Sequence, residues 1–167
     1  ASSEAVPLVK TGGLGDVSGS LPLALHRLGH DVRLVMPAYA GAVARVSDLE
    51  LLGTVPVARA PGVVRLLEGT LDTSTVPVYL VDAPELFDRA GNPYVGPDGR
   101  DWPDNALRFA TLCRVASEIA LGHSSLAWQP DLVHANDWQT GLIAPFLADV
   151  AGRPATLFTI HNLSYQG

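Results

Sequence analysis

A glycine-rich turn beside the only lysine of the chain is the first group of residues that could do chemistry. Lys10 precedes Gly12, Gly13 and Gly15, and helical periodicity starts within this turn. Glycines let a backbone approach a ligand closely, and the first N–H groups of a helix attract anions. The turn matches neither a Walker A loop nor a dinucleotide fingerprint. It therefore indicates either a phosphate contact or simply a tight turn into a helix.

A second group follows an apolar segment that reads as a buried strand. His134 ends this segment, and Asp137 and Trp138 come directly after it. A carboxylate beside an indole suits a sugar, because the carboxylate accepts hydrogen bonds from hydroxyls while the ring stacks on the apolar sugar face. The alternative is that Asp137 only caps the next helix. His134 and Asp137 could ligate a metal, but without a third ligand nearby no metal site is predicted.

A third group, His161 and Asn162, follows the next apolar segment in the same way. A histidine at a strand end can be a satisfied core group as well as a functional one. Tyr94 lies in the sequence Asn92-Pro93-Tyr94, which is first of all a turn signal. On residue types alone, both a structural and a functional interpretation stay open for His161, Asn162 and Tyr94.

Composition limits the kind of protein that carries these groups. The 167 residues fit one domain, 47% of them are apolar, and the net charge is −6. Without a Lys/Arg cluster, a nucleic-acid groove or an anionic membrane surface is not expected as a partner. The apolar runs are too short to cross a bilayer, no signal peptide opens the chain, and Cys113 has no partner for a disulfide. We expect a soluble, cytoplasmic α/β domain.

The apolar periodicity predicts the elements that position the three groups. Spacings of three and four predict one helix face, formed by Leu14, Val17, Leu21, Leu25 and Leu28. We expect Pro22 to kink this helix or to restrict its regular part to either side, and Gly29 to end it. Further helices are predicted at 104–122 and 138–151, with a loop at 84–99. Strands or extended segments are predicted at 31–36, 51–58, 63–72, 76–82, 131–135 and 155–160.

Strands that alternate with helices favour a Rossmann-like, doubly wound and mostly parallel sheet. Ligands of such sheets collect at the carboxyl ends of the strands. Three polar clusters lie at predicted strand ends or helix starts, at 10–16, 134–140 and 161–166. We therefore expect these clusters to converge on one site.

Several motifs, taken together and in this order, resemble the N-terminal domain of the bacterial glycogen synthase and plant starch synthase family. They are KTGGLGD, LGHDVRLVMPAY, GNPY, WPDNALRF, PDLVHANDWQTGL and TLFTIHNLSYQG. The resemblance covers nearly the whole chain and implies the GT-B architecture, in which two Rossmann-like domains face each other across a cleft. Residues 1–167 would form the first domain with its first strand nearly absent, and the donor-binding second domain is not part of the chain.

The resemblance also implies an activity and roles for single residues. The family transfers glucose from ADP-glucose, or UDP-glucose in some members, to the non-reducing end of an α-1,4-glucan, with retention and without a metal or cofactor. His161 would be catalytic through its backbone carbonyl, and Lys10, Gly12, Gly13 and Gly15 would contact the donor phosphates. The acceptor and sugar side would be formed by Tyr94, Asp137, Trp138 and Asn162. Asn136 and Gln139 stand where some members have histidines and receive no catalytic role.

Two other functions remain open at this point. A stand-alone glucan-binding module would use the same acceptor surface without chemistry. A nucleotide-sugar enzyme of another GT-B family, such as sucrose synthase, is disfavoured by KTGGLGD together with HNLSYQG. Because most of the donor site would lie on the second domain, we expect the 167 residues alone to be inactive as a synthase.

Overall fold

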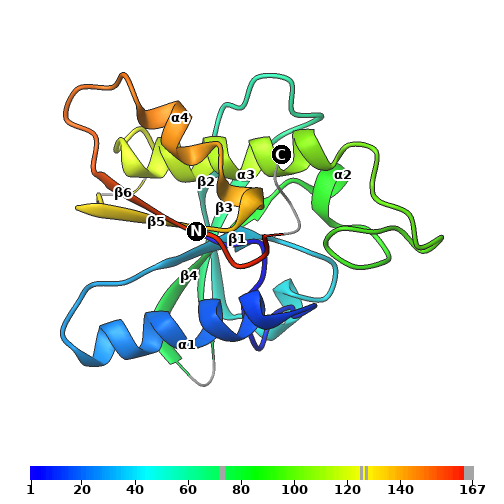
Figure 1. Cartoon of the computed structure of the whole chain (residues 1–167), viewed down its shortest axis with the longest axis horizontal. Helices are drawn as coiled ribbons and strands as arrows, with labels where there is room; N and C mark the ends of the chain where they lie inside the picture. Colours follow the sequence, from blue (N-terminus) through cyan, green and yellow to red (C-terminus); the bar gives the residue numbers. More distant parts are fainter. Residues whose placement is uncertain (72–73, 125, 127, 164–167) are drawn as a thin grey trace.

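The computed structural model describes residues 1–71, 74–124, 126 and 128–163 as a sheet layer between helices (Figure 1). Helix α1 covers one side of the sheet, and helices α3 and α4 cover the other. The helices are α1 (Gly13–Arg27), α2 (Pro84–Phe87), α3 (Asn105–Ala120) and α4 (Ile143–Leu147), with short 3-10 turns η1 (Val43–Arg45) and η2 (Trp138–Thr140). The strands are β1 (Leu34–Pro37), β2 (Ser47–Thr54), β3 (Arg65–Leu71), β4 (Ser74–Asp82), β5 (Leu132–Asn136) and β6 (Ala155–Thr159).

The sheet is mixed, so the expected mostly parallel, doubly wound sheet is not confirmed. Strands β1 and β4 are parallel, but β3 is antiparallel to both of its neighbours in the order β1-β4-β3-β2. Strands β5 and β6 form a separate parallel pair. The reason lies in chain length, since Leu71 and Ser74 are too close in sequence for the crossover of a dozen or more residues that parallel neighbours need.

Residues Ala1 and Ser2 connect the two strand groups. The amino group of Ala1 donates to His134 O at 2.7 Å, and Asn136 N donates to Ala1 O at 3.2 Å. Ser2 N donates to the oxygen of Val35 in β1 at 3.0 Å. The first two residues therefore lie between β1 and β5, and Ala1 lines a cavity of about 540 Å³. The N-terminal residues thus join β5 to β1 through backbone hydrogen bonds.

Helix α1 is confirmed, but its predicted inner face is partly wrong. Its buried residues are Leu14, Gly15 and Ser18, whereas Val17 and Leu28 are 38% and 75% exposed. The helix also runs through Pro22 without ending there. Gly15 and Ser18 are buried because this part of the helix lies close to the preceding segment, whose Val6 N donates to Gly15 O at 2.9 Å.

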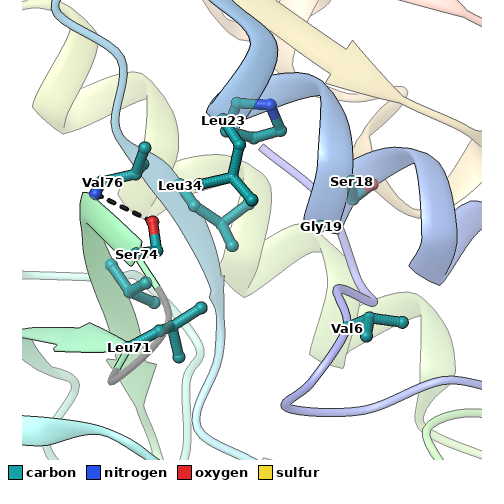
Figure 2. Close-up of a pocket in the computed structure, with 10 residues that line it drawn as sticks. Val6, Ser18, Gly19, Leu23, Leu34, Leu71, Ser74 and Val76 are labelled. Carbon is teal, nitrogen blue, oxygen red and sulfur yellow. Dashed lines mark hydrogen bonds between the residues drawn. The ribbon is translucent and has the colours of Figure 1, made fainter. Parts of the chain in front are cut away.

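Helix α1 packs tightly against the segment that precedes it at Gly19, which lies beside Val6 (Figure 2). A Cβ at Gly19 would be 2.6 Å from the backbone oxygen of Val6, so no larger residue fits without a shift. Figure 2 shows the small cavity next to this contact, of about 30 Å³, with Leu23 and Leu34 in its wall. This contact fixes α1, and with it the glycine-rich turn at the start of the helix.

Helix α3 agrees with the sequence analysis, whereas the helix predicted at 138–151 is wrong. Its apolar face is buried and includes Phe109, Leu112, Cys113, Ala116, Ile119 and Ala120. In place of the second helix, η2 and α4 are separated by a turn. Proline lacks an N–H and clashes with the carbonyl four residues before it, so Pro145 is compatible only with the first turn of a new helix. The predicted loop at 84–99 contains the short helix α2.

Strand β6 forms one edge of the parallel pair and carries apolar side chains at the surface. Leu157, Phe158 and the following Ile160 are 47%, 43% and 56% exposed. An unpaired strand edge with apolar side chains favours association with another chain.

Within the described residues, no helix is both long and apolar enough to cross a membrane.

We therefore expect the 167-residue chain to self-associate through β6 at roughly 50 μM, a range in which exposed edges commonly aggregate. Sedimentation velocity should show oligomers, and replacing Phe158 by lysine should shift the distribution toward monomer. Leu28→Lys, which adds the same charge at an exposed position of α1, should leave the distribution unchanged. A native chain that sediments as a single monomer at this concentration would contradict the expectation.

Candidate functional site

The three polar clusters converge on one pocket of about 450 Å³, as expected from the sequence. The start of α1, the turn after β5 and the segment after β6 each contribute to its lining. The lining residues are Glu4, Thr11, Gly12, Gly13, Leu14, Val17, Tyr94, Asp137, Trp138, Gln139, His161 and Asn162. Ser164 to Gln166, the end of the third cluster, lie outside the described residues. We refer to this pocket as the central pocket.

Asp137 combines a capping contact with a strained backbone at the pocket wall. Its φ is 63° and its ψ is 176°, a combination that costs a non-glycine residue about 1–3 kcal/mol. Its backbone N–H donates to Thr159 O at 2.8 Å, and its Oδ1 accepts from Trp138 N at 3.0 Å. The capping interpretation is therefore correct, and the same residue lines the central pocket. Strain of this kind is typical of functional positions.

His161 is held by a side chain from the neighbouring strand. Its Nε2 lies 3.1 Å from Asn136 Oδ1, while Asn136 Nδ2 lies 3.2 Å from Ala1 O. Because the amide donates to a carbonyl, Oδ1 is the acceptor, and His161 Nε2 carries the donated proton. Asn136 thus orients the ring of His161, a role that the sequence analysis did not assign.

Aromatic rings form one wall of the central pocket. The Tyr94 ring lies 6.2 Å from that of Trp138 and 6.0 Å from that of Phe109, which in turn meets Trp138 edge-on at 5.1 Å. Tyr94 and Trp138 line the pocket, and Phe109 supports both from α3. Such a wall offers apolar ring faces next to the polar groups of Asp137 and Asn162.

The turn that carries Tyr94 is anchored by a buried arginine. Arg108 is 1% exposed and donates to the backbone oxygens of Pro93 and Leu86, each at 2.7 Å. It also donates to Asn105 Oδ1 at 2.7 Å. Burial lowers the pKa of Arg108, but an arginine side chain stays charged at any physiological pH. The motif WPDNALRF therefore supports the pocket wall through the turn that carries Tyr94.

Lys10 and Gly15, which were predicted to contact phosphate, lie outside the lining of the central pocket. Lys10 Nζ forms an ion pair with Asp16 at 2.7 Å, and both side chains are more than half exposed. A Cβ at Gly15 would be 3.2 Å from the Cβ of Lys10, so the glycine makes room for the lysine stem. Gly12 and Gly13 do line the pocket. The lysine is thus near the rim, on the same turn.

The structure adds Glu4, Thr11 and Gln139 to the candidate residues. Glu4 and Gln139 are 2% and 3% exposed, and both line the central pocket. Glu4 could have been singled out because a carboxylate stands alone within the otherwise uncharged segment before Lys10. Gln139 and Thr11 carry no comparable signal in the sequence.

His134 contributes to strand pairing and not to the central pocket. Its Nε2 lies 2.7 Å from Thr159 Oγ1 on the neighbouring strand. Burial is the main cause that lowers the pKa of His134, so the ring is neutral at pH 7. Across the described ranges, no three His, Cys, Asp or Glu side chains group as potential metal ligands.

The fold and the pocket together define an α/β domain whose central pocket lies at the carboxyl ends of β5 and β6. The model of the family described as the starch synthase catalytic domain matches residues 1–167. The chain therefore belongs to the starch synthase catalytic domain family, and the resemblance seen in its motifs is confirmed.

Related proteins agree with this assignment. A glycogen synthase of Thioalkalivibrio sulfidiphilus is 56% identical across 100% of the chain, which spans 35% of that relative. Glycogen synthase 1 of Methylococcus capsulatus is 55% identical over 99% of the chain and 33% of its own length. The catalytic domain of starch synthase IV from Arabidopsis thaliana, solved with ADP and acarbose, superimposes with a TM-score of 0.79 at 30% identity, over 98% of this chain and 33% of that one. The chain thus spans about a third of these relatives.

Proposed function

We propose that the chain is the acceptor-side domain of a retaining glucosyltransferase. The parent enzyme would transfer glucose from ADP-glucose, or from UDP-glucose, to the non-reducing end of an α-1,4-glucan. The observation that carries the proposal is the central pocket, in which the glycine turn of α1 faces Asp137, Trp138, Tyr94 and His161. The ADP and acarbose bound to the Arabidopsis neighbour, a nucleotide and a sugar-like ligand, support the same pair of ligand classes.

On the donor side, the charge to be stabilised is that of the departing diphosphate. The first N–H groups of α1, at Gly13 to Gly15, have no acceptor within the helix and favour an anion at this position. The Lys10–Asp16 ion pair is exposed and therefore weak in water, so Lys10 can exchange Asp16 for a phosphate oxygen. Because the diphosphate charge develops in the transition state, these contacts would accelerate the transfer itself.

On the acceptor side, the pocket offers hydrogen-bonding groups next to rings. The carboxylate of Asp137 accepts from Trp138 N through one oxygen and has capacity for a sugar hydroxyl. Tyr94 and Trp138 present ring faces for the apolar side of a glucose unit. The backbone carbonyl of His161 would stabilise the positive charge of the oxocarbenium-like state, while the Asn136 contact keeps the ring in place.

This division of roles predicts which ligand the 167-residue chain binds. ADP-glucose should bind only in the millimolar range or weaker, about −4 kcal/mol, because the partners that would come from a second domain are missing. Maltohexaose should bind more tightly, since its contacts lie mainly on this domain. Calorimetric titration should also show that Asp137→Asn weakens maltohexaose binding, whereas Asp149→Asn at an exposed position does not. Micromolar binding of ADP-glucose without glucan binding would mean that the roles are reversed.

A stand-alone glucan-binding module is the second candidate. It is favoured by one observation, namely that the acceptor-side residues line the central pocket while Lys10 lies outside the lining. Transfer of radiolabelled glucose to maltohexaose distinguishes the two functions. A full-length protein that carries this chain and binds glucan without any transfer would favour the module.

A further inference from the structure

One buried carboxylate joins the two sides of the central pocket. Glu4 Oε2 accepts the backbone N–H groups of Thr11 and Gly12, the latter at 3.3 Å. Glu4 Oε1 accepts from the Thr11 hydroxyl at 2.7 Å and from the Tyr94 hydroxyl. Four donors from two segments that are far apart in the sequence therefore share one side chain that is 2% exposed.

The protonation state of Tyr94 fixes the direction of this contact. Burial, followed by the hydrogen bond to Glu4, raises the pKa of Tyr94 far above neutrality, so the phenol is protonated and donates. The Ser3 hydroxyl lies 2.9 Å from the same phenol oxygen. The ring of Tyr94 is thus held at its polar end by two groups of the N-terminal segment.

The backbone of Glu4 is itself fixed to α1. Ser2 Oγ donates to Glu4 O at 2.8 Å, and Ser18 Oγ donates to Ser2 Oγ at 2.8 Å. Ser2 and Ser18 are 0% and 4% exposed. Buried hydrogen-bond networks of this kind are rigid when every member has partners. The carboxylate is therefore a fixed point and not a mobile side chain.

We propose that Glu4 is a positioning residue that holds the glycine turn and Tyr94 at a fixed distance from each other across the central pocket. This proposal rests on the proposed function, in which the glycine turn contacts the donor phosphates and the side with Tyr94 contacts the acceptor glucan. Glu4 already occupies the N–H groups of Thr11 and Gly12. The phosphate contact then falls to the first-turn amides of α1 at Gly13 and Leu14, which line the pocket.

Glu4→Gln tests this role because its NH₂ group cannot accept the hydrogen bonds that one carboxylate oxygen accepts. Amide exchange followed by NMR should be about tenfold faster or more at Thr11 and Gly12, the effect of losing a hydrogen bond to a charged group. Amides of β4 such as Tyr79 and Leu80 should change by less than about twofold, because global stability is retained. Maltohexaose affinity should fall by about tenfold, in line with one lost charged hydrogen bond. Glu50→Gln, at an exposed position of β2, serves as the matched control.

Two results would overturn the role of Glu4: unchanged exchange at Thr11 and Gly12, or equal acceleration of all core amides, which would mark a merely structural residue. Should Glu4→Gln fail to fold, Tyr94→Phe removes one donor to Glu4 and keeps the ring. Unaltered exchange of the loop amides in that variant would equally overturn the proposal. Exchange needs no sugar, so failure of the native chain to bind maltohexaose counts against the proposed function and not against the contacts of Glu4.

Discussion

Replacing Lys10 by alanine in a full-length synthase that carries this chain will lower turnover by about 10²–10³-fold, the usual effect of removing one group that stabilises transition-state charge. The KM for the glucan should change little, because Lys10 lies outside the pocket that holds the acceptor-side residues. Lys10→Arg should also lose most of the activity. A planar, forked guanidinium does not replace a compact ammonium on a stem that packs closely against Gly15.

Initial rates at saturating ADP-glucose and maltohexaose measure this effect. Arg27→Ala, which removes an exposed cation from the last turn of the same helix, is the matched control and should retain full activity. If Lys10→Ala turns over like the native enzyme, the glycine turn serves only to start α1. A rise in the glucan KM alone would instead place Lys10 on the acceptor side.

Replacing Arg108 by methionine will destabilise the chain by about 3–5 kcal/mol, because each of its three orphaned acceptors costs about 1–3 kcal/mol. The substitution leaves the backbone oxygens of Leu86 and Pro93 and the Asn105 side chain without their donor. Methionine fills much of the volume, so the loss reflects the orphaned acceptors more than a cavity. The midpoint of thermal unfolding should fall by roughly 10 °C.

Arg114→Met on the same helix is the matched control for Arg108. Arg114 stacks on the Phe146 ring at 3.9 Å, but its side chain is 37% exposed and its ion pair with Glu118 is long, at 3.9 Å. We expect a change of less than about 1 kcal/mol for this exposed position. Equal losses in the two variants would show that the Arg108 contacts carry no special stability. Circular dichroism during thermal or urea unfolding measures both.

Local pattern was sufficient to predict α3, β5 and β6, which position part of the pocket. The period of α3 and the apolar runs of β5 and β6 identified these elements, and the polar residues after the strands converged as parallel strand ends require. The direction of β3 was missed, although the short connection between Leu71 and Ser74 already demanded a hairpin. The helix expected at 138–151 is broken between Thr140 and Ile143, because Pro145 fits only the first turn of a new helix, and this reason was visible in the sequence.

Other features could not be predicted, because they depend on contacts between distant segments. The inner face of α1 follows from how closely Gly19 meets Val6, and periodicity carries no information on such a distance. The proposed role of Glu4 depends on its hydrogen bond with Tyr94, which lies 90 residues away in the sequence and reaches Glu4 only through folding. Asp137 has a positive φ, a conformation that an aspartate tolerates but that its presence in a sequence does not predict. Site residues that act through tertiary contacts thus require the structure.

The position of Ala1 between β1 and β5 has a consequence for the order of folding. Its partners lie more than 130 residues further along the chain, as in the hydrogen bond to His134 with a separation of 133 residues. Contacts of such high contact order form slowly, because a long loop must close before they contribute. During synthesis the segment from β1 to β4 leaves the ribosome long before β5 exists. The sheet of β1 to β4 can therefore form first, and the central pocket forms only after β5 and β6 have been synthesised.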